Sequence, residues 1–483
     1  MLCDNGEEYT QMDFACRTHY VRSANKGDNG VARLFGTDGV RGVANRELTP
    51  ELAFRVGYAA ACVLGAGETE APFFAIGKDT RYSGDLLEAA LMAGVMAAGV
   101  DVCPLGVIPT PGVAYVTRVS GALAGVMISA SHNPMEDNGI KFFGADGFKL
   151  FDAVEDKIEA QMDQLDDCER PTGSGVGKVV KKTQGIAEYA AFLRETVRHS
   201  FAGLQVAVDA AHGAAYELAA RVLRDLGADV KLFAAEPDGV NINVACGSTH
   251  PAHIAQRVRE CGADVGLAFD GDADRLIAVD ERGNIVDGDR VMLICAKDMT
   301  QRGALSGQTI VTTIMSNYGF VKAARDLGLE LVRTVVGDRY VMEAMREGGY
   351  VLGGEQSGHV IFLQYNTTGD GILTALQLLD VVAGSGKKLS ELADVMRSYP
   401  QVLINVRVQD KTAWQRNGAI VQAIKKVEDK LADEGRVLVR ESGTEPVVRV
   451  MVEGAVEEEV RRFAEEIAAA VRRELGAEQK ATC

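Results

Sequence analysis

The chain has 483 residues and a formal net charge of -17 at pH 7, and 47% of its residues are hydrophobic. This length predicts roughly three or four domains, and the composition is typical of a globular protein. The acidic balance argues against a nucleic-acid or anionic-membrane partner, because both would favour a basic surface. The apolar runs are short or interrupted by Gly, so no membrane span is expected.

Nine cysteines occur without a CxxC pair. An odd count without metal-ligand spacing predicts reduced thiols and a cytoplasmic location. We interpret residues 1–32 as an N-terminal extension, because they carry acidic side chains and no apolar signal region. Polar or Pro-containing breaks divide the remainder into four expected domains, at residues 33–183, 184–287, 288–400 and 401–483.

Most of the chain repeats one pattern, an apolar strand followed by a Gly- or Ser-rich loop and an amphipathic helix. The strand patterns lie at 73–77, 124–128, 206–209, 263–269 and 309–314, and the clearest helical patterns at 83–98 and 214–226. Strands that alternate with helices predict parallel sheets with helices on both faces. Ligands of such sheets bind beyond the carboxyl ends of the strands.

The last segment has a different pattern. Strand-like runs at 402–408, 437–440 and 447–452 surround two helical patterns, and the helix at 456–475 has apolar residues every three to four positions. This order predicts a separate α+β domain.

A serine loop follows the strand pattern at 124–128, with the sequence Ser129-Ala130-Ser131-His132-Asn133-Pro134. An exposed serine hydroxyl at a strand end can accept and donate a phosphoryl group. We expect Asn138-Gly139 to form a tight turn that brings Lys141 close. A polar turn without a ligand explains the loop alone equally well. A serine hydrolase is disfavoured, since neighbouring Ser131 and His132 are not expected to face one another.

A carboxylate loop follows the strand pattern at 263–269 and contains Asp270, Asp272 and Asp274. Alternate carboxylates can converge on one hard cation, and Mg²⁺ is favoured because it leaves room for phosphate oxygens. A solvated acidic turn is the alternative, although three adjacent carboxylates without a cation would repel one another. An EF-hand is excluded because Arg275 occupies the sixth position, which requires Gly.

Several further loops carry groups that suit phosphate or sugar. The loop at 440–446 combines hydroxyls, Gly443, Arg440 and nearby Arg449, which suit a phosphate dianion. Glu355 and Ser357 offer acceptors for sugar hydroxyls. Arg41 in a Gly-rich loop, and Lys78 with Arg81 beside Asp79, are the candidate local cations of this acidic chain. A solvated turn is the alternative for each loop taken alone.

Six segments together resemble the α-D-phosphohexomutase superfamily: RLFGTDGVRG, IGKDTRYSG, SASHNP, DGDADR, GGEQSGH and RESGTEP. The resemblance runs from about Arg33 to about Ala470. It implies four domains around a central cleft, with three related mixed α/β sheets sandwiched by helices and a C-terminal α+β domain similar to the TATA-binding protein. The implied enzyme is an isomerase that moves phosphate between two positions of a hexose.

The resemblance also implies roles for individual residues. It implies a phosphoserine at Ser131 and Mg²⁺ bound by this serine, Asp270, Asp272 and Asp274. It places Glu355 and Ser357 against sugar hydroxyls. The group expected to hold the non-reacting phosphate is Ser442, Gly443, Thr444 and Arg449, with Arg440 beside it.

Residues 237–249, 315–317 and 336–340 resemble the branch of the superfamily that acts on glucosamine phosphate. Glucosamine 1,6-bisphosphate is then the expected intermediate and activator, and the product would serve UDP-N-acetylglucosamine and peptidoglycan synthesis. An enzyme for mannose or glucose phosphates is the alternative within the superfamily. Gln364 departs from the family pattern, which often has a charged residue there.

We expect the resting enzyme to carry phosphate on Ser131, with developing charge neutralised by Arg275, Lys141 and Arg41. Asp338 and Arg339 lie in a loop expected to face the sugar and are further sugar-binding candidates. The general acid and base stay open among His132, Asp338 and Arg339. A sugar-phosphate-binding protein without catalysis and a phosphatase are the rival interpretations. The oligomeric state is open, a homodimer included.

Overall fold

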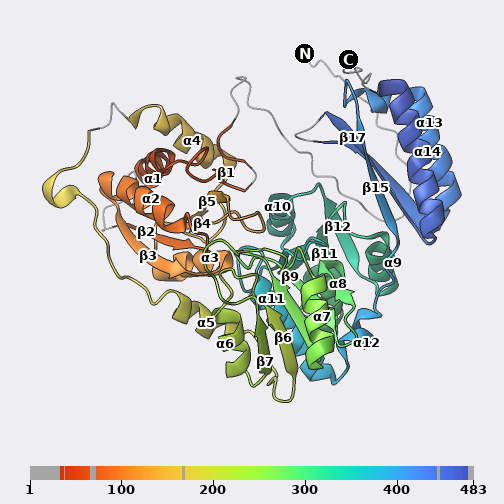
Figure 1. The fold of residues 1–483 in the computed structure, drawn as a ribbon, viewed down its shortest axis with the longest axis horizontal. Coiled ribbons are helices and arrows are strands. Elements are labelled where there is room, and N and C mark those ends of the chain that lie inside the picture. Colours follow the sequence, from red (N-terminus) through yellow and green to blue (C-terminus); the bar gives the residue numbers. More distant parts are fainter. Residues whose placement is uncertain (1–32, 37, 66–71, 166–168, 443–445, 477–483) are drawn as a thin grey trace, which may run out of the picture.

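The structure is a computed structural model that describes residues 33–36, 38–65, 72–165, 169–442 and 446–476. The strands of these residues form four separate sheets, one in each expected domain. Figure 1 shows domain 1 on the left, domains 2 and 3 below it and to the right, and domain 4 at the upper right. Within the described ranges no helix is long and apolar enough to cross a membrane.

The sheet of domain 1 has the order β1-β5-β4-β2-β3. β2 pairs in parallel with β3 and β4, whereas β5 runs antiparallel between β4 and β1. Helices on both faces bury the apolar strands, which are wholly buried in β4. The elements are β1 Val40–Val43, α1 Pro50–Leu64, β2 Phe73–Lys78, α2 Gly84–Ala97, β3 Asp101–Val107, α3 Thr110–Ser120, β4 Ala124–Ile128, β5 Asp137–Gly144 and α4 Asp152–Met162.

Domain 2 repeats this topology, with the strand order β10-β9-β8-β6-β7. β6, β7 and β8 are parallel, and β9 and β10 form the antiparallel side. The same order in two consecutive domains confirms that they are related in fold. The elements are α5 Ile186–Glu195, β6 Gln205–Asp209, α6 Leu218–Asp225, β7 Asp229–Phe233, α7 Ala252–Cys261, β8 Val265–Phe269, β9 Leu276–Asp280 and β10 Ile285–Val286.

Domain 3 has a shorter sheet of order β12-β11-β13-β14, in which only β14 is antiparallel to its neighbour. One continuous apolar core runs through domains 2 and 3 and reaches α3 of domain 1. The elements are α8 Gly288–Gln301, β11 Thr309–Thr313, α9 Tyr318–Asp326, β12 Glu330–Thr334, α10 Asp338–Gly348, β13 Leu352–Gly354, β14 Val360–Phe362, α11 Gly371–Ser385 and α12 Leu389–Ala393.

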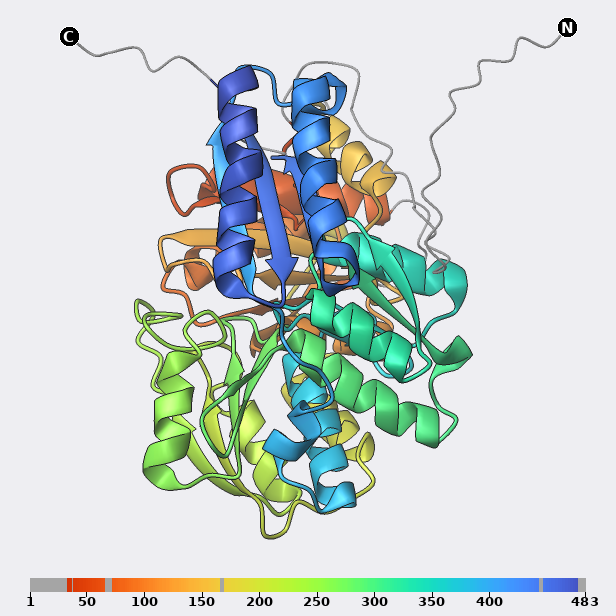
Figure 2. The ribbon, with the colours of Figure 1, turned by 90° about the vertical axis from the view of Figure 1, so that its right-hand side faces the viewer.

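Domain 4 is the predicted α+β unit and has its own apolar core. Its three strands are all antiparallel, with the order β15-β17-β16. Figure 2 shows its two helices side by side over one face of this sheet. The elements are β15 Gln401–Arg407, α13 Gly418–Leu431, β16 Gly435–Glu441, β17 Val447–Gly454 and α14 Glu457–Leu475.

Two local predictions are wrong. Asn138-Gly139 is not a turn, because both residues lie in β5 and pair with β1, where Gly139 faces Arg41. The turn comes earlier, before Asp137. The helix predicted at 214–226 begins only at Leu218. Residues 214–217 form a turn instead, after Ala211 and His212, whose positive φ angles of 52° and 50° end the extended chain of β6.

Candidate active site

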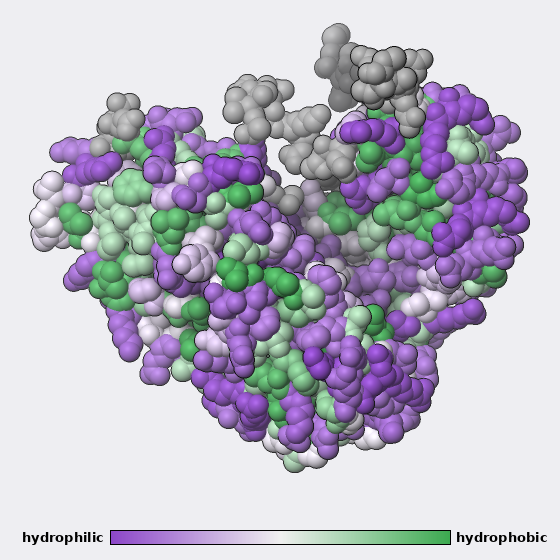
Figure 3. All heavy atoms as spheres, in the orientation of Figure 1, coloured by the Kyte–Doolittle hydropathy of each residue, from purple (hydrophilic) through white to green (hydrophobic). Residues whose placement is uncertain are grey.

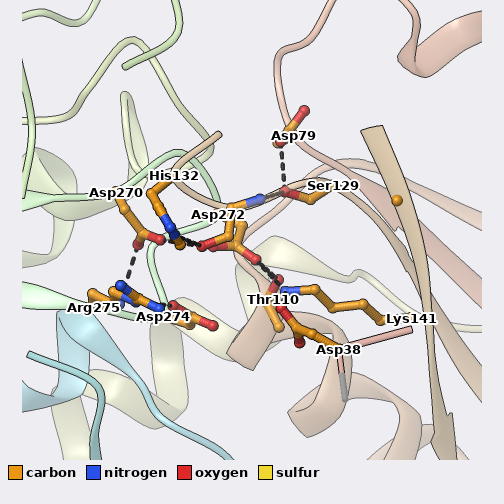
Figure 4. Close-up of polar contacts among 12 residues, drawn as sticks. Asp38, Asp79, Thr110, Ser129, His132, Lys141, Asp270, Asp272, Asp274 and Arg275 are labelled. Carbon is orange, nitrogen blue, oxygen red and sulfur yellow. Dashed lines mark hydrogen bonds and ion pairs between the residues drawn. The ribbon is translucent and has the colours of Figure 1, made fainter. Parts of the chain in front are cut away.

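The serine loop and the carboxylate loop meet where domains 1 and 2 join. β4 and β8 end at these loops, as expected for sheets whose ligands lie beyond the carboxyl ends of parallel strands. Ser131 Oγ donates a hydrogen bond of 2.6 Å to Asp270 Oδ2. Thr110, the first residue of α3, donates its hydroxyl to Asp272 Oδ2 at 2.7 Å. Figure 4 shows Thr110 beside Asp272, with Asp270 and Asp274 close to it.

The backbone of Ser131 is in the left-handed region, with φ at 53°. Residues other than Gly rarely adopt this conformation, and it persists where surrounding contacts enforce it. Ser131 N donates to Ser129 Oγ at 2.9 Å, and Ser129 Oγ donates in turn to Asp79 Oδ2 at 2.6 Å. The three residues therefore form a buried chain that fixes the direction of the Ser131 side chain.

Arg81 is not a cation for a ligand, contrary to the sequence interpretation. Its side chain is buried and paired with Asp79, whose Oδ2 lies 2.9 Å from Nε. The remaining guanidinium nitrogens donate to four backbone carbonyls of the serine loop, those of Ser131, Asn133, Pro134 and Asp137. Lys78 is likewise paired with carboxylates of α2, those of Asp85 and Glu88. Both cations support the fold of domain 1.

Asp270, Asp272 and Asp274 lie together, with one carboxylate oxygen of each within 4.8 Å of the others. All three are buried. Burial, and after it the charges of Asp274 and Asp272, hold the pKa of Asp270 well above its usual range. Burial would also raise the pKa of Asp274, but His359, Lys141 and Arg275 hold it below its usual range.

The carboxylate group suits a divalent metal ion. Asp272 Oδ1 and Asp274 Oδ1 are buried and accept no hydrogen bond from the described residues. Buried carboxylate oxygens without partners are costly in a protein interior unless a cation binds them. Because only oxygen ligands are offered, a hard cation such as Mg²⁺ fits this group better than Zn²⁺, which prefers His and Cys.

Cations surround the carboxylates, as expected. Lys141 Nζ lies 3.0 Å from Asp272 Oδ2 and 3.5 Å from Asp38 Oδ2. Burial lowers the pKa of Lys141, but Asp272 and Asp38 outweigh it, so the ammonium stays charged. Arg41 pairs with Asp38, and Arg275 N donates to Asp270 Oδ1 at 3.2 Å. The Nε atoms of both arginines are buried without a hydrogen-bond partner.

His132 lies closer to the serine than the sequence suggested. Its Nδ1 is 3.2 Å from Ser131 Oγ, although neighbouring residues were not expected to face one another. Burial, followed by the charges of Arg275 and Arg41, lowers the pKa of His132, so the ring is neutral near pH 7. Among the described residues no carboxylate hydrogen-bonds to His132, so the orienting acid of a hydrolase triad is missing.

On the domain 3 side, His359 joins the site and was missed in the sequence. Its Nδ1 is 3.5 Å from Asp274 Oδ2 and its Nε2 is 3.8 Å from Asp338 Oδ2. Asp338 also pairs with Lys149 at 2.5 Å, and Lys149 Nζ lies 2.9 Å from Asp38 Oδ1. These charges line a pocket between domains 1 and 3. His359 ends the GGEQSGH segment, but its contact with Asp274 depends on the packing of domain 3 against domain 2.

The other predicted sugar-binding residues differ in their exposure and in their partners. Glu355 is half-buried, and its Oε1 accepts from Gly337 N at 3.2 Å, while Ser357 is exposed on the same loop. Arg339 pairs with Asp152 and with Glu343 at 3.1 Å, and it also lines the pocket between domains 1 and 3. The structure therefore places Asp338 and Arg339 at this pocket. Glu355 lies close to Arg275, and although burial lowers the pKa of that guanidinium, neighbouring carboxylates that include Glu355 raise it overall.

The predicted phosphate loop lies in domain 4. Arg440 of β16 stands opposite Arg449 of β17, and Arg449 donates to Ser442 Oγ at 3.3 Å. Burial and then Arg449 lower the pKa of Arg440. Two facing guanidiniums beside a hydroxyl suit a dianion. Gly443 and Thr444 lie outside the described residues. Figure 3 shows the surface hollowed between the lobes of domains 1 and 4.

The four-domain fold and the meeting of a serine loop with a carboxylate loop are those of a phosphohexomutase. The family models of phosphoglucomutase/phosphomannomutase match all four domains: alpha/beta/alpha domain I at residues 32–168, domain II at 187–283, domain III at 287–399 and the C-terminal domain at 403–470. The chain belongs to the phosphoglucomutase/phosphomannomutase family.

Curated relatives are similar over almost the whole chain. The phosphoglucosamine mutase of Shouchella clausii (strain KSM-K16) is 57% identical over 92% of this chain and 100% of its own length. That of Geobacillus kaustophilus (strain HTA426) is 56% identical over 93% of this chain and 100% of its own.

Solved structures share the fold at lower identity. A phosphoglucomutase/phosphomannomutase family protein of Burkholderia thailandensis has a TM-score of 0.75 at 24% identity and covers 92% of this chain and 100% of its own. Aspergillus fumigatus N-acetylphosphoglucosamine mutase, in complex with GlcNAc-6P and magnesium, has a TM-score of 0.64 at 20% identity, with coverage of 93% and 97%.

Proposed function

We propose that this enzyme interconverts glucosamine 6-phosphate and glucosamine 1-phosphate, with Ser131 as the phosphoryl carrier. The observation that carries the proposal is the Ser131 hydroxyl, held 2.6 Å from Asp270 within a buried group of carboxylates and cations. The choice of glucosamine rests on the phosphoglucosamine mutases that are 54–57% identical to this chain.

In the first transfer, the phosphoryl group leaves Ser131 Oγ as a sugar hydroxyl oxygen bonds to phosphorus. The proton of that hydroxyl ends on Ser131 Oγ, so the phosphoryl group and the proton exchange places. The product is glucosamine 1,6-bisphosphate, which turns round and returns its other phosphoryl group to Ser131. Dividing the isomerisation into two transfers uses the same site twice.

Asp270, Asp272, Asp274 and the serine phosphate would hold one Mg²⁺. This ion would neutralise charge on the transferring phosphoryl group. Lys141 and Arg41 share the negative charge from the domain 1 side, and the Arg275 guanidinium, whose Nε lies 3.8 Å from Asp274 Oδ1, does so from domain 2. Preorganised donors of this kind typically contribute about 3 kcal/mol each to lowering the barrier.

We assign His132 to proton transfer at Ser131 Oγ. Its ring nitrogen is 3.2 Å from this oxygen, and its lowered pKa leaves it neutral and able to accept a proton. Glu355, Ser357 and Asp338 would contact the sugar hydroxyls. Arg440, Ser442 and Arg449 would hold the non-reacting phosphate during both transfers.

Ser131→Ala tests the carrier. We expect turnover to be abolished and the mass increase of about 80 Da, the added phosphoryl group, to be absent from the intact protein. Normal activity of this variant with bisphosphate supplied would overturn the proposal. The sugar is tested by comparing glucosamine, glucose and mannose 6-phosphates at equal concentration, where faster turnover of mannose or glucose phosphate would assign the chain to the other branch.

Two further expectations stay with this proposal. The described cysteines are all free thiols, which supports a reducing, cytoplasmic location. A homodimer stays a prediction that sedimentation velocity would test.

A further inference from the structure

Residues 237–249 of domain 2 have no role in the proposed mechanism, although they are among the sequence marks of the glucosamine branch. Asn243 in this segment is buried and has a positive φ of 61°. Its side-chain amide donates to the carbonyl of Ser131 at 2.9 Å and to that of Asn133 at 3.1 Å. A side chain of domain 2 thus contacts the backbone of the serine that domain 1 supplies.

The carbonyl of Ser131 is held from both domains. Arg81 donates to it from domain 1 at 2.9 Å, and Asn243 donates to it from domain 2 at the same distance. The carbonyl of Asn133 has the same two donors, at 2.8 Å and 3.1 Å. Because the carbonyl orientation sets the peptide plane after Ser131, these bonds hold the strained conformation that directs its hydroxyl.

Hydrogen bonds within domain 2 hold the backbone of Asn243. Its N–H donates to the carbonyl of Ala211 at 2.9 Å. Ala211 N and Gly247 N donate to opposite oxygens of Asp209, each at 2.9 Å, and His253 Nδ1 lies 2.6 Å from this carboxylate. Asp209 is the last residue of β6, so these bonds tie the segment to the end of a central strand.

Asn243 also touches the carboxylate loop. A Cβ atom at Gly271, between Asp270 and Asp272, would lie 2.6 Å from the Ser131 carbonyl oxygen and 3.0 Å from Asn243 Nδ2. The serine loop, the carboxylate loop and the Asn243 amide therefore meet in contact, with no space between them. A shift of one of the three would alter the distance from Ser131 Oγ to Asp270.

We infer that Asn243 is a positioning residue for phosphoryl transfer. Its side-chain amide holds the serine loop of domain 1 in a fixed position relative to the carboxylate loop of domain 2. The inference rests on the proposed function, since it assumes that Ser131 carries the phosphoryl group. The Ser131 hydroxyl and its metal ligands belong to different domains, so their distance depends on the domain contact that Asn243 makes.

Asn243→Gly is the sharpest test, because Gly accepts the positive φ of this position while the side-chain amide is removed with its Cβ. Misplacing a reacting group by about 1 Å can cost about 100-fold in rate. We expect kcat to fall about 10- to 100-fold and KM for the sugar phosphate to change less than about threefold. KM should be retained because Glu355, Ser357 and the two arginines of domain 4, Arg440 and Arg449, are unchanged in this variant.

Asn243→Asp keeps the shape and the backbone preference but places carboxylate oxygens against two carbonyl oxygens. We expect it to lose at least as much kcat as Asn243→Gly. Asn45 provides the matched control, since it is exposed, has a φ of 60° and its side chain makes no hydrogen bond to the described residues. Asn45→Gly and Asn45→Asp should keep kcat within about twofold of wild type.

Hydrogen exchange gives a readout that does not depend on activity. In the metal-free protein, amides of residues 131–137 should exchange faster in Asn243→Gly than in wild type, while those of domain 4 should not change. A purely structural role would lower kcat only in proportion to the folded fraction measured by circular dichroism.

The inference is wrong if Asn243→Gly keeps kcat within about twofold of wild type, if its loss matches the unfolded fraction, or if only KM rises. Ser131→Ala separates this failure from failure of the proposed function. An inactive Ser131→Ala together with a fully active Asn243→Gly would reject the positioning role alone. An active Ser131→Ala would reject both.

Discussion

Replacing Asp270 by Asn removes one charge from the three buried carboxylates and keeps the shape of the side chain. In the native site Asp270 Oδ2 accepts from Ser131 Oγ at 2.6 Å, and Oδ1 accepts from Arg275 N at 3.2 Å. The Asn side chain can keep both contacts, because its oxygen accepts from Arg275 N and its NH₂ donates to the serine hydroxyl. The variant therefore tests charge and not packing.

The size of the effect follows from the distances. Two unit charges separated by 4.8 Å repel by about 3.5 kcal/mol at an effective dielectric constant of about 20. Lys141 and Arg275 offset part of this repulsion, so we expect the metal-free variant to be more stable than wild type by about 1–3 kcal/mol. With Mg²⁺ added, wild type should instead be more stable than Asp270→Asn, because the ion binds the wild-type site and stabilises only the folded protein.

The stability of the metal-free protein should change with pH in a definite direction. The folded-state pKa of Asp270 is raised, so the folded protein binds this proton more tightly than the unfolded chain. Metal-free wild type should lose stability as pH rises from the ordinary carboxyl pKa of about 4 toward the raised value. Asp270→Asn should lack this part of the loss.

Urea unfolding followed by circular dichroism at about pH 5 and about pH 8, with EDTA or with millimolar Mg²⁺, measures both effects. Asp326→Asn is the matched control, since Asp326 is exposed at the end of α9. The charge explanation fails if metal-free Asp270→Asn is no more stable than wild type, or if Mg²⁺ stabilises both proteins equally.

Two further changes test other parts of the molecule. Arg440→Ala should raise KM for the sugar phosphate about 10- to 100-fold, because a hydrogen bond to a charged group contributes about 1.5–3 kcal/mol. Arg416→Ala, on the exposed surface of domain 4, should leave this KM unchanged. Equal KM values for the two variants would refute the phosphate role of Arg440. Burial raises the pKa of Asp289 to about 8, so wild type should lose stability as pH rises from about 4 to about 8. Asp289→Asn should abolish this part of the loss, and an unchanged pH profile of urea unfolding would contradict it.

The loops that carry chemistry could be predicted because their residues are contiguous. Ser131 follows β4 and Asp270 follows β8, and apolar strands that end in polar loops are visible in the sequence. The order of strands and helices likewise predicted three helix-covered sheets and a different last domain. The residue types within each loop were compatible with a phosphoryl carrier and its metal, but a polar turn explained the serine loop alone equally well, and only the six segments together favoured the carrier.

Contacts between distant segments could not be predicted in the same way. Arg81 has the composition of a ligand-binding cation, but only the fold shows that its donors serve carbonyls about 50 residues later. His359 and Asn243 enter the site from other domains. The Asn138-Gly139 turn failed for a related reason, because pairing with β1 overrides the local turn preference of these two residues.

The facing pair of Arg440 and Arg449 has a consequence for how the enzyme responds to salt. In the ligand-free protein two like charges stand on adjacent strands, and a dianion bound between them would offset their mutual repulsion. Dissolved ions would screen this repulsion as well as the attraction to phosphate. The affinity of domain 4 for the substrate phosphate should therefore weaken as ionic strength rises.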